Sequence, residues 1–383
     1  MKISCTQENL NQGLNIVSHI AGRNSNLPIL ANILIKVSDK IITLSTTNLE
    51  IGITVDIRGK IEKEGEFSVD AKLFSNYIAL LPKERIDLEL INDELKIECS
   101  NQKTKIKIQN ATDFPLIPKV DKNNPYLISV KELKNSIPEV VFAAANSEIR
   151  PEISGVLMDF IENKLILAAT DSYRLTEKKI ELLQKNNQDN KIIIPVKTLQ
   201  ELWRILGVFK DDISLEDTDN IEIYLNENQI MFSYNGVDLI SRVIEGQYPP
   251  YNQIIPQKFQ TLIKLNNTEL IKIVKTSSLF AKSGIYDIKL DFSDDEKNHL
   301  IITSSSSQTG ESVAKLEAEI KGENNFIVLN YRYLLEGLQN INSERVVIEA
   351  NDKNSLCILR PEGIDNYLYL IMPIRQEEEN KEE

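Results

Sequence analysis

The stretch Thr170-Asp171-Ser172-Tyr173-Arg174 contains the residues of this chain that come closest to a catalytic group. A serine becomes a nucleophile only when a neighbouring base takes its proton, and histidine is the most common base. No base lies near Ser172 in the sequence, and the chain has no phosphate-binding loop. We interpret Asp171 as part of a polar turn that leaves a buried strand. A hydrolase that uses Asp171 and Ser172 is therefore the weaker hypothesis, and we expect no catalytic residue.

Other catalytic and cofactor chemistry finds little support in the sequence. The chain has two histidines, His19 and His299, so a metal site of several histidines cannot be built, and we expect neither a metal nor a cofactor. The Walker A, Rossmann, zinc-protease and nucleophile-elbow motifs are absent. The three cysteines are scattered, which disfavours a disulfide framework and favours a reducing cytoplasm.

The overall composition is typical of a protein that is not inserted in a membrane. The chain has 383 residues, which predicts two or three domains, and 42% of its residues are hydrophobic. No run of about 18 apolar residues occurs, and the N-terminus lacks the apolar region of a secretion signal, so we expect a cytoplasmic protein. The formal net charge of −13 argues against nucleic acid as a partner, unless the charge is unevenly distributed.

A weak repeat of roughly 125 residues indicates how the chain is organised. Each copy begins with a short strand and a helix that has one apolar face. A strand hairpin follows, and then a strand that leads into a second helix. The first helices are predicted over residues 7–20, 131–145 and 268–281, the hairpins over 33–45, 156–170 and 288–304, and the second helices over 71–81, 197–206 and 331–339.

The pattern of each copy predicts an α+β architecture in which two helices lie on an antiparallel sheet. Asp70, Pro195 and Asn330 precede the second helices, where they suit caps or first-turn positions. Pro138 is expected to kink the first helix of the second copy or to mark its start after Ser136. The serine run 304–307 is interpreted as a loop.

The predicted helices differ in charge from the remainder of the chain. They carry nine basic and six acidic residues, a net charge of +3, although the whole chain has −13. Helices that all face one partner would therefore present a positive surface to it, and the remaining surface would repel nucleic acid. A scaffold of repeated domains that does not bind nucleic acid is the alternative, favoured if the exposed helix faces are neutral.

Several motifs, in order and spacing, resemble the bacterial DNA polymerase III β subunit, the sliding clamp. They are Leu27-Pro28-Ile29-Leu30, Asp113-Phe114-Pro115, Arg150-Pro151, Ser154-Gly155-Val156-Leu157, Ala168-Ala169-Thr170-Asp171-Ser172-Tyr173-Arg174-Leu175, Gly246-Gln247-Tyr248-Pro249 and Tyr369-Leu370-Ile371-Met372-Pro373-Ile374-Arg375. The resemblance extends from residue 1 to about residue 375.

The resemblance implies three clamp domains at residues 1–123, 124–250 and 251–375, followed by an acidic, disordered tail at 376–383. Two copies would form a head-to-tail homodimer, a ring of six domains with the helices lining its hole. Such a ring encircles duplex DNA without sequence specificity and tethers DNA polymerase III through its alpha subunit, the clamp loader, other polymerases and repair proteins. The clamp itself performs no chemistry.

The resemblance implies three groups of residues, which face DNA, form the dimer interface or line a groove for partner peptides. The DNA-facing residues would be Arg23, Asn24, Lys72, Ser147, Arg150, Lys197 and Arg204. The dimer interface would contain Ile106, Leu279 and Phe280, although a place in the core of a domain fits these three equally well.

A groove for partner peptides with Leu and Phe anchors would lie between the second and third repeats, with two arginines at its edges. Its residues would be Ile153, Thr170, Ser172, Tyr173, Arg174, Leu175, Pro249, Gln253, Ile254, Leu356, Leu370, Met372, Pro373, Ile374 and Arg375. Ile153, Leu175 and Leu370 are also consistent with an ordinary core. Gln253 and Asn354 depart from the usual residues of the groove, and we expect the acidic tail to weaken the binding of acidic peptides.

Overall fold

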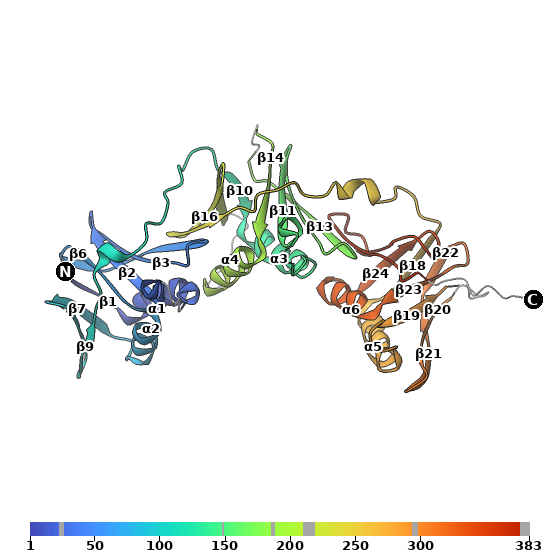
Figure 1. Ribbon diagram of the computed structural model, residues 1–383, viewed down its shortest axis with the longest axis horizontal. Coiled ribbons are helices and arrows are strands. Elements are labelled where there is room, and N and C mark those ends of the chain that lie inside the picture. Colours follow the sequence, from blue (N-terminus) through green and yellow to red (C-terminus); the bar gives the residue numbers. More distant parts are fainter. Residues whose placement is uncertain (23–26, 148, 185–187, 210–218, 293–297, 376–383) are drawn as a thin grey trace, which may run out of the picture. The chain divides into compact units, whose positions relative to one another are not determined.

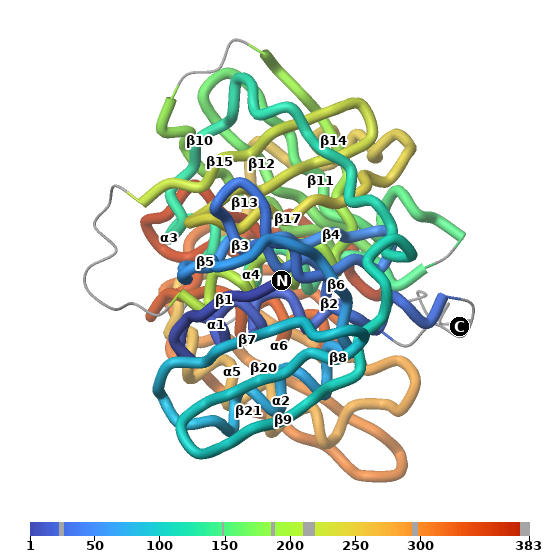
Figure 2. Tube along the Cα trace, turned by 90° about the vertical axis from the view of Figure 1, so that its left-hand side faces the viewer, coloured from blue at the N-terminus to red at the C-terminus, as the bar shows by residue number. Residues whose placement is uncertain are grey.

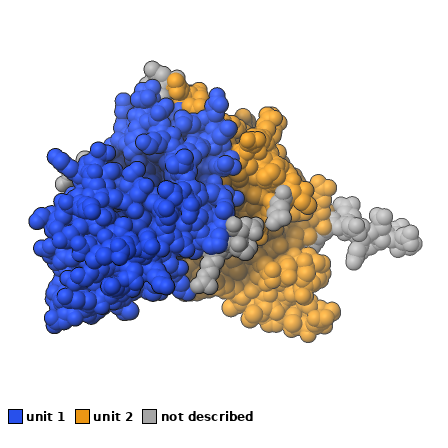
Figure 3. Space-filling model, turned by 60° about the vertical axis from the view of Figure 1, so that its left-hand side comes forward, with its two compact units in different colours: residues 1–134, 182–186, 197–243 blue, residues 135–181, 187–196, 244–383 orange. Residues whose placement is uncertain are grey.

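The computed structural model describes residues 1–22, 27–147, 149–184, 188–209, 219–292 and 298–375. The chain divides into two compact units, which Figure 3 colours separately. Unit 1 consists of residues 1–134, 182–186 and 197–243, and unit 2 of residues 135–181, 187–196 and 244–383. The predicted tail at 376–383 lies outside the described residues.

Unit 1 begins with strand β1 and helix α1, and α1 packs beside α2 and against strands β3 and β4 (Figure 1). Its helices and strands, in chain order, are β1 (Lys2–Thr6), α1 (Gln7–Val17), β2 (Asn32–Ser38), β3 (Ile41–Thr47), β4 (Ile51–Ile57), β5 (Lys60–Lys63), β6 (Gly65–Asp70), α2 (Ala71–Leu80), β7 (Arg85–Ile91), β8 (Glu94–Cys99), β9 (Gln102–Lys107), β10 (Tyr126–Ser129), α4 (Val196–Val208), β15 (Asn220–Asn226), β16 (Gln229–Tyr234) and β17 (Val237–Arg242). Helix α3 (Val130–Val141) begins in this unit and continues in unit 2.

Two antiparallel sheets form the framework of unit 1. The first has the order β5-β1-β7-β8-β9, and the second has the order β10-β15-β16-β17-β4-β3-β2-β6. In Figure 2, β7, β8 and β9 face the viewer. Apolar side chains alternate along the strands, so that Ile33, Ile35 and Val37 of β2 are all buried. Asp70, at the start of α2, accepts a hydrogen bond from the backbone N–H of Leu73, which confirms its predicted capping role.

Unit 2 contains a nine-stranded sheet of order β14-β11-β12-β13-β26-β25-β24-β18-β22 and a four-stranded sheet of order β21-β20-β19-β23. Helices α5 and α6 pack beside each other (Figure 1). The elements, in chain order, are β11 (Gly155–Ile161), β12 (Lys164–Thr170), β13 (Arg174–Glu181), β14 (Asn190–Pro195), β18 (Thr261–Asn266), α5 (Asn267–Ser277), β19 (Asp287–Asp291), β20 (His299–Ser306), β21 (Gly310–Glu317), β22 (Glu319–Gly322), β23 (Phe326–Asn330), α6 (Tyr331–Asn340), β24 (Arg345–Ala350), β25 (Cys357–Pro361) and β26 (Tyr367–Ile371).

Neighbouring repeats are joined by one recurring strand pairing. The third strand after the first helix of a repeat is β4, β13 or β21, and the last strand of a repeat is β9, β17 or β26. β4 of the first repeat pairs with β17 of the second, and β13 of the second pairs with β26 of the third. Each pairing makes one continuous sheet from two repeats. The same rule leaves β21 and β9 as sheet edges among the described residues.

The predicted architecture of two helices on antiparallel sheet in each repeat is confirmed, with two local corrections. Helix α3 starts at Val130 and contains Pro138, so the alternative of a start after Ser136 is wrong. The serines at 304–306 belong to strand β20 and not to a loop, and Ser304 is buried. None of the described helices has the length and apolar character that a membrane crossing requires.

Candidate functional site

The turn between β12 and β13 is built by its own polar side chains. Asp171 accepts hydrogen bonds through Oδ1 from the backbone N–H groups of Tyr173 (2.9 Å) and Arg174 (3.0 Å). The Thr170 hydroxyl accepts one from the N–H of Ser172 (3.1 Å), which has a φ of 80°. These bonds confirm that Asp171 forms a turn. Its carboxylate is committed to backbone N–H groups, so it does not prepare Ser172 for nucleophilic attack.

The side chain of Arg174 holds this turn in place. Its guanidinium donates to Asp171 Oδ2 (3.0 Å), to the backbone carbonyl of Phe142 (2.9 Å) and to the carboxylate of Glu336. It also lies 4.7 Å from the centre of the Tyr333 ring. Burial lowers the pKa of Arg174, but the hydrogen bond and charge of Glu336, together with the nearby Tyr369 hydroxyl, more than offset this, so the pKa is raised overall. The charged side chain of Arg174, expected at an edge of the groove, is buried in these contacts.

A buried apolar cluster lies beside the turn, where β13 pairs with β26. Leu175 and Leu370 are opposite each other in this pairing, and Leu356 belongs to the same cluster. All three were predicted, whereas several other members were not. The unpredicted members are Leu157, Ala168, Ile193, Tyr248, Tyr251, Ile358 and Leu368, with Ile244, Ile255 and Phe259 packed against them. Leu157, Ala168 and Tyr248 lie within motifs that carried the resemblance, and these motifs were the sequence signal that could have pointed to them.

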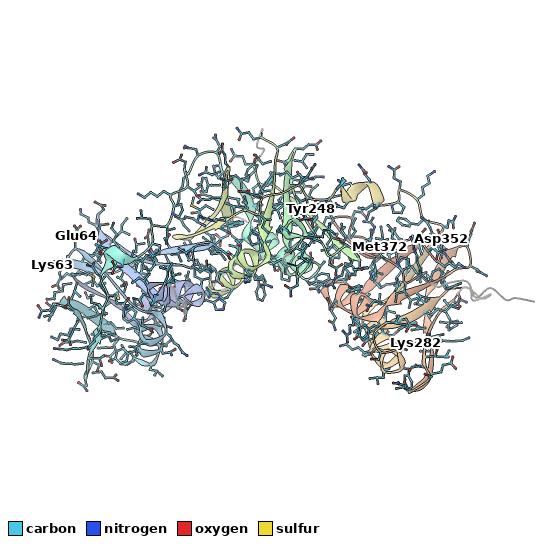
Figure 4. The ribbon with its side chains drawn as sticks, in the orientation of Figure 1. Lys63, Glu64, Tyr248, Lys282, Asp352 and Met372 are labelled. Carbon is cyan, nitrogen blue, oxygen red and sulfur yellow. The ribbon has the colours of Figure 1, made fainter. Side chains whose placement is uncertain are left out.

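The two tyrosines of the cluster have hydrogen-bond partners. Tyr248 donates to the carbonyl of Ala168 (3.3 Å), and Tyr251 donates to Glu177 Oε2 (2.7 Å). Burial, together with the nearby charge of Glu177, raises the pKa of Tyr251, so its hydroxyl remains a donor. Both residues follow β17 along the chain and hold the segment after it against β11–β13. Figure 4 labels Tyr248 and also Met372, which follows β26.

Exposed apolar side chains lie next to the buried cluster. Tyr173 is 63% exposed and Met372 is 39% exposed, and the backbone N–H of Met372 donates to the carbonyl of Tyr173 (2.8 Å). Ile254 is also exposed. Of the other predicted groove residues, Ile153 and Thr170 are buried, Pro249, Pro373 and Ile374 are half-buried, and Ser172, Gln253 and Arg375 are exposed. Burial of Ile153, Leu175 and Leu370 agrees with their alternative interpretation as core residues.

The predicted DNA-facing residues fall into distinct environments. Lys72 on α2 and Lys197 on α4 are exposed. Ser147 is half-buried, and Arg150 donates to Ser172 Oγ (3.0 Å) and Glu152 Oε1 (3.1 Å). Arg23 and Asn24 lie outside the described residues.

Arg204 joins two helices of unit 1. It donates to the backbone carbonyls of Asn15 (2.8 Å) and Ile16 (2.6 Å) at the end of α1 and to Glu201 Oε1 (2.6 Å). Glu201 is buried and is also 2.7 Å from Nδ1 of His19. Most of the hydrogen-bonding capacity of Arg204 is therefore used within the protein.

The predicted interface residues also differ in burial. Ile106 on β9 is buried, whereas Leu279, just after α5, is 72% exposed and Phe280 is half-buried. Leu279 is thus not a core residue of unit 2. Within the described parts of the chain, no group of three or more His, Cys, Asp or Glu side chains is arranged to hold a metal ion.

Comparison with known proteins identifies the family. Models of the DNA polymerase III beta subunit match residues 1–118 with its N-terminal domain, 127–250 with its central domain and 252–375 with its C-terminal domain. The chain belongs to the DNA polymerase III beta subunit family. The beta sliding clamp of Synechococcus elongatus is 28% identical over 379 residues, which cover 98% of this chain and 99% of the relative. That of Staphylococcus aureus is 29% identical over 361 residues, covering 91% and 92%.

Solved structures of DNA polymerase III beta subunits share the fold. The DNA polymerase sliding clamp of Bacillus subtilis and the beta subunit from Streptococcus pyogenes each match with a TM-score of 0.90 and 26% identity. Each match covers 98% of this chain and 100% of the other. The chain therefore has the three-domain sliding-clamp fold. The family is the non-catalytic subunit that makes DNA polymerase III processive, so the hydrolase hypothesis is wrong.

Proposed function

We propose that two copies of this chain close into a ring around duplex DNA and hold the replicative polymerase on its template. The observation that carries the proposal is the match to the DNA polymerase III beta subunit in all three domains. Topological linkage keeps the polymerase close to the primer end, so its effective concentration there stays high without any chemistry by the clamp. The ring would act in the cytoplasm.

The strand pairings inside the chain support a head-to-tail ring. In the first two repeats, the third strand after the first helix (β4 or β13) pairs with the last strand of the next repeat (β17 or β26). Among the described strands, only β21 and β9 lack this pairing. In a homodimer, β21 of one copy would pair with β9 of the other. Two identical, heterologous contacts then close the ring. Leu279 and Val313, both exposed near this edge, would be covered by the partner.

The exposed faces of the helices support a weak, sequence-independent hold on DNA. Basic side chains stand on them at Lys72, Lys131, Lys197, Lys272, Lys275 and Arg332. Among the described residues they are interspersed with exposed amides such as Gln12, Asn76 and Gln200. Contacts from a few cations to phosphates hold DNA weakly, and the chain has no motif that would bind particular bases. Both properties suit a ring that slides along DNA. We keep Arg23, Asn24, Lys72, Ser147, Arg150 and Lys197 as proposed DNA contacts, and Arg204 as a neighbour of that surface.

Peptides from the polymerase alpha subunit, the clamp loader and repair proteins would bind beside the β13–β26 pairing. Tyr173, Ile254 and Met372 offer exposed apolar contacts there, and the Asp171 turn fixes the position of Tyr173. A flexible methionine adapts to different Leu and Phe anchors. We further propose domain boundaries near residues 123 and 250.

The decisive experiment compares circular and linear DNA. The protein is loaded by a clamp loader and ATP on nicked plasmid, half of which is then cut with a restriction enzyme. Retention on the circle and loss from the linear DNA is expected, because a ring leaves DNA only at an end. Equal, salt-sensitive loss from both would indicate ordinary electrostatic binding and contradict the proposal.

A further inference from the structure

A cavity of about 810 Å³ lies in unit 1, at the junction of the first and second repeats. Its floor is formed by side chains of β2, β3, β4, β16 and β17, among them Leu34, Met231 and Ile240. The segment 111–122, which follows β9, forms its other wall through residues that include Ile117 and Val120. Val120, Met231 and Ile240 form a buried cluster with Tyr224, and Ile117 packs against it. The volume is in the range of cavities that hold small ligands and short peptide segments.

The internal repeat places this cavity where the proposed peptide site lies one repeat later. The cavity lies over the pairing of β4 with β17, which corresponds to the pairing of β13 with β26. Phe114-Pro115 follows β9 as Tyr248-Pro249 follows β17, and Phe114 and Tyr248 are both buried. Pro249 is a proposed groove residue, and its counterpart Pro115 lines the cavity. Both junctions therefore have an apolar sheet face crossed by a proline-containing connecting segment.

The connecting segment is held close to the sheet but leaves an apolar side chain free. A side chain larger than glycine at residue 52 on β4 would meet Ile117, because an added Cβ would lie 2.8 Å from Ile117 Cγ2. The neighbouring Leu116 also lines the cavity, yet it is 95% exposed. Leu116 is thus available to contact an occupant at the mouth of the cavity.

The charges around the cavity indicate what the occupant carries. Lys122 is 2.9 Å from Asp238, and Lys36 is 3.8 Å from Glu66, so these two lysines are matched by carboxylates of the lining. Lys119 is exposed, and no ion pair of it is found among the described residues. The lining therefore has one positive charge in excess, next to apolar walls. An apolar side chain beside a carboxylate complements both features.

We propose that this cavity is a second docking site, for short peptides in which a large apolar side chain stands next to an acidic residue. The inference rests on the proposed function, because it gives the first junction the class of ligand proposed for the second. One chain would then present two peptide sites, so that two partner segments could be held on the same clamp.

The four methionines of the chain make the two sites separately observable. Met231 lines the cavity, Met372 belongs to the proposed groove, and Met1 and Met158 are buried elsewhere. The full-length protein, labelled with 13C at the methionine methyl groups, is titrated with the acetylated, amidated pentapeptide DLDLF, and an all-alanine pentapeptide serves as control. The chemical shift of the Met231 methyl group is expected to change with peptide concentration and to saturate, following a binding curve separate from that of Met372.

Substitutions at exposed positions distinguish the two sites without destabilising the folded protein. Leu116→Asp is expected to weaken the binding seen at Met231 by about tenfold and Lys119→Glu by roughly threefold to fivefold, with the Met372 curve unchanged. Ile254→Asp is expected to weaken binding at Met372 and leave the Met231 curve unchanged.

Three outcomes would overturn the inference. A shift of Met372 alone leaves the proposed function intact and rules out the second site. A Met231 shift that disappears with Ile254→Asp would be a remote effect of groove binding. If neither signal moves, the proposed peptide binding of the groove fails together with this inference.

Discussion

Arg204 illustrates how one side chain near the proposed DNA-facing surface serves the fold. We expect Arg204→Ala to lower the free energy of unfolding by about 3 kcal/mol, because it removes the partner of the buried Glu201 and leaves two carbonyls at the end of α1 without their donor. Urea denaturation followed by circular dichroism measures this change.

Lys197→Ala provides the matched control on the same helix. Its side chain is exposed, so the free energy of unfolding should change by less than about 0.5 kcal/mol, while affinity for duplex DNA falls modestly. If Arg204→Ala were as stable as Lys197→Ala and bound DNA equally poorly, Arg204 would be a DNA contact and not a link between helices.

At the residue scale, local signals were predictable and distant partners were not. The polar turn at Asp171 follows from residue types within four positions, and the structure confirms it. The burial of Arg174 was not predictable, because its partner Glu336 lies 162 positions away. No local pattern reveals such a pairing, and the same holds for the contact of His19 with Glu201. Which residues touch DNA or a peptide stays a prediction.

At the scale of elements, α6 depends on a glycine that packs against β26. A methyl group at Gly337 would clash with the buried ring of Tyr369. We expect Gly337→Ala to destabilise the protein by about 1–3 kcal/mol through overpacking, despite the better helix propensity of alanine. Gly207→Ala in α4 is the control, because no atom lies within 4 Å of its added methyl group. It should be neutral or stabilising by up to about 1 kcal/mol. The midpoints of thermal unfolding of both variants measure these effects. Equal changes in the two variants would contradict the clash between residue 337 and Tyr369.

Helix α4 also contains a natural probe of its environment. Trp203 is the single tryptophan of the chain and is 47% exposed on the side of α4 that carries Lys197 and Gln200. If this face lines the hole of the ring, loading onto circular DNA should reduce quenching of its fluorescence by acrylamide. Linear DNA of the same sequence, from which the ring escapes, should leave quenching unchanged. Identical quenching on the circle would place α4 away from the DNA.

Most elements followed from hydrophobic periodicity, and the exceptions have physical reasons. The helices and hairpins were predictable because each buries one face. The serines at 304–306 were taken for a loop because serine is common in turns, whereas in β20 the pairing with β21 outweighs that preference. Pro138 was expected to kink α3 or to mark its start, yet the helix runs from Val130 to Val141 with the proline inside it. A proline inside a helix removes a backbone donor and so costs stability, but it does not by itself set where the helix begins.

At the scale of the whole molecule, the proposed ring closure would bury side chains that a single copy leaves exposed. We expect Leu279→Asp to weaken the dimer roughly 30-fold, about 2 kcal/mol, because a charge would be buried against the partner. Sedimentation over a range of concentrations measures the dissociation constant. Ile364→Asp, an equally drastic change at another exposed position of the same repeat, should leave the dimer intact. A dimer that tolerates Leu279→Asp would place the interface elsewhere.

The three repeats were visible in the sequence, but the strand pairings between them were not. Pairing of β4 with β17 joins residues almost two hundred positions apart, and each strand alone is an ordinary alternating segment. The order of motifs identified the family and hence the fold, while the free edges β9 and β21 became apparent only once the other strands were placed.

The continuous sheets also determine where the length of this chain can change during evolution. A single-residue insertion in β4 would turn its later side chains to the opposite face against both β3 and β17, so one event would disturb two repeats together. The same holds for β13 and β26. Insertions and deletions are therefore expected to gather in hairpin turns such as Asp39-Lys40 and to avoid the strands at the junctions, even where those strands lie at the surface.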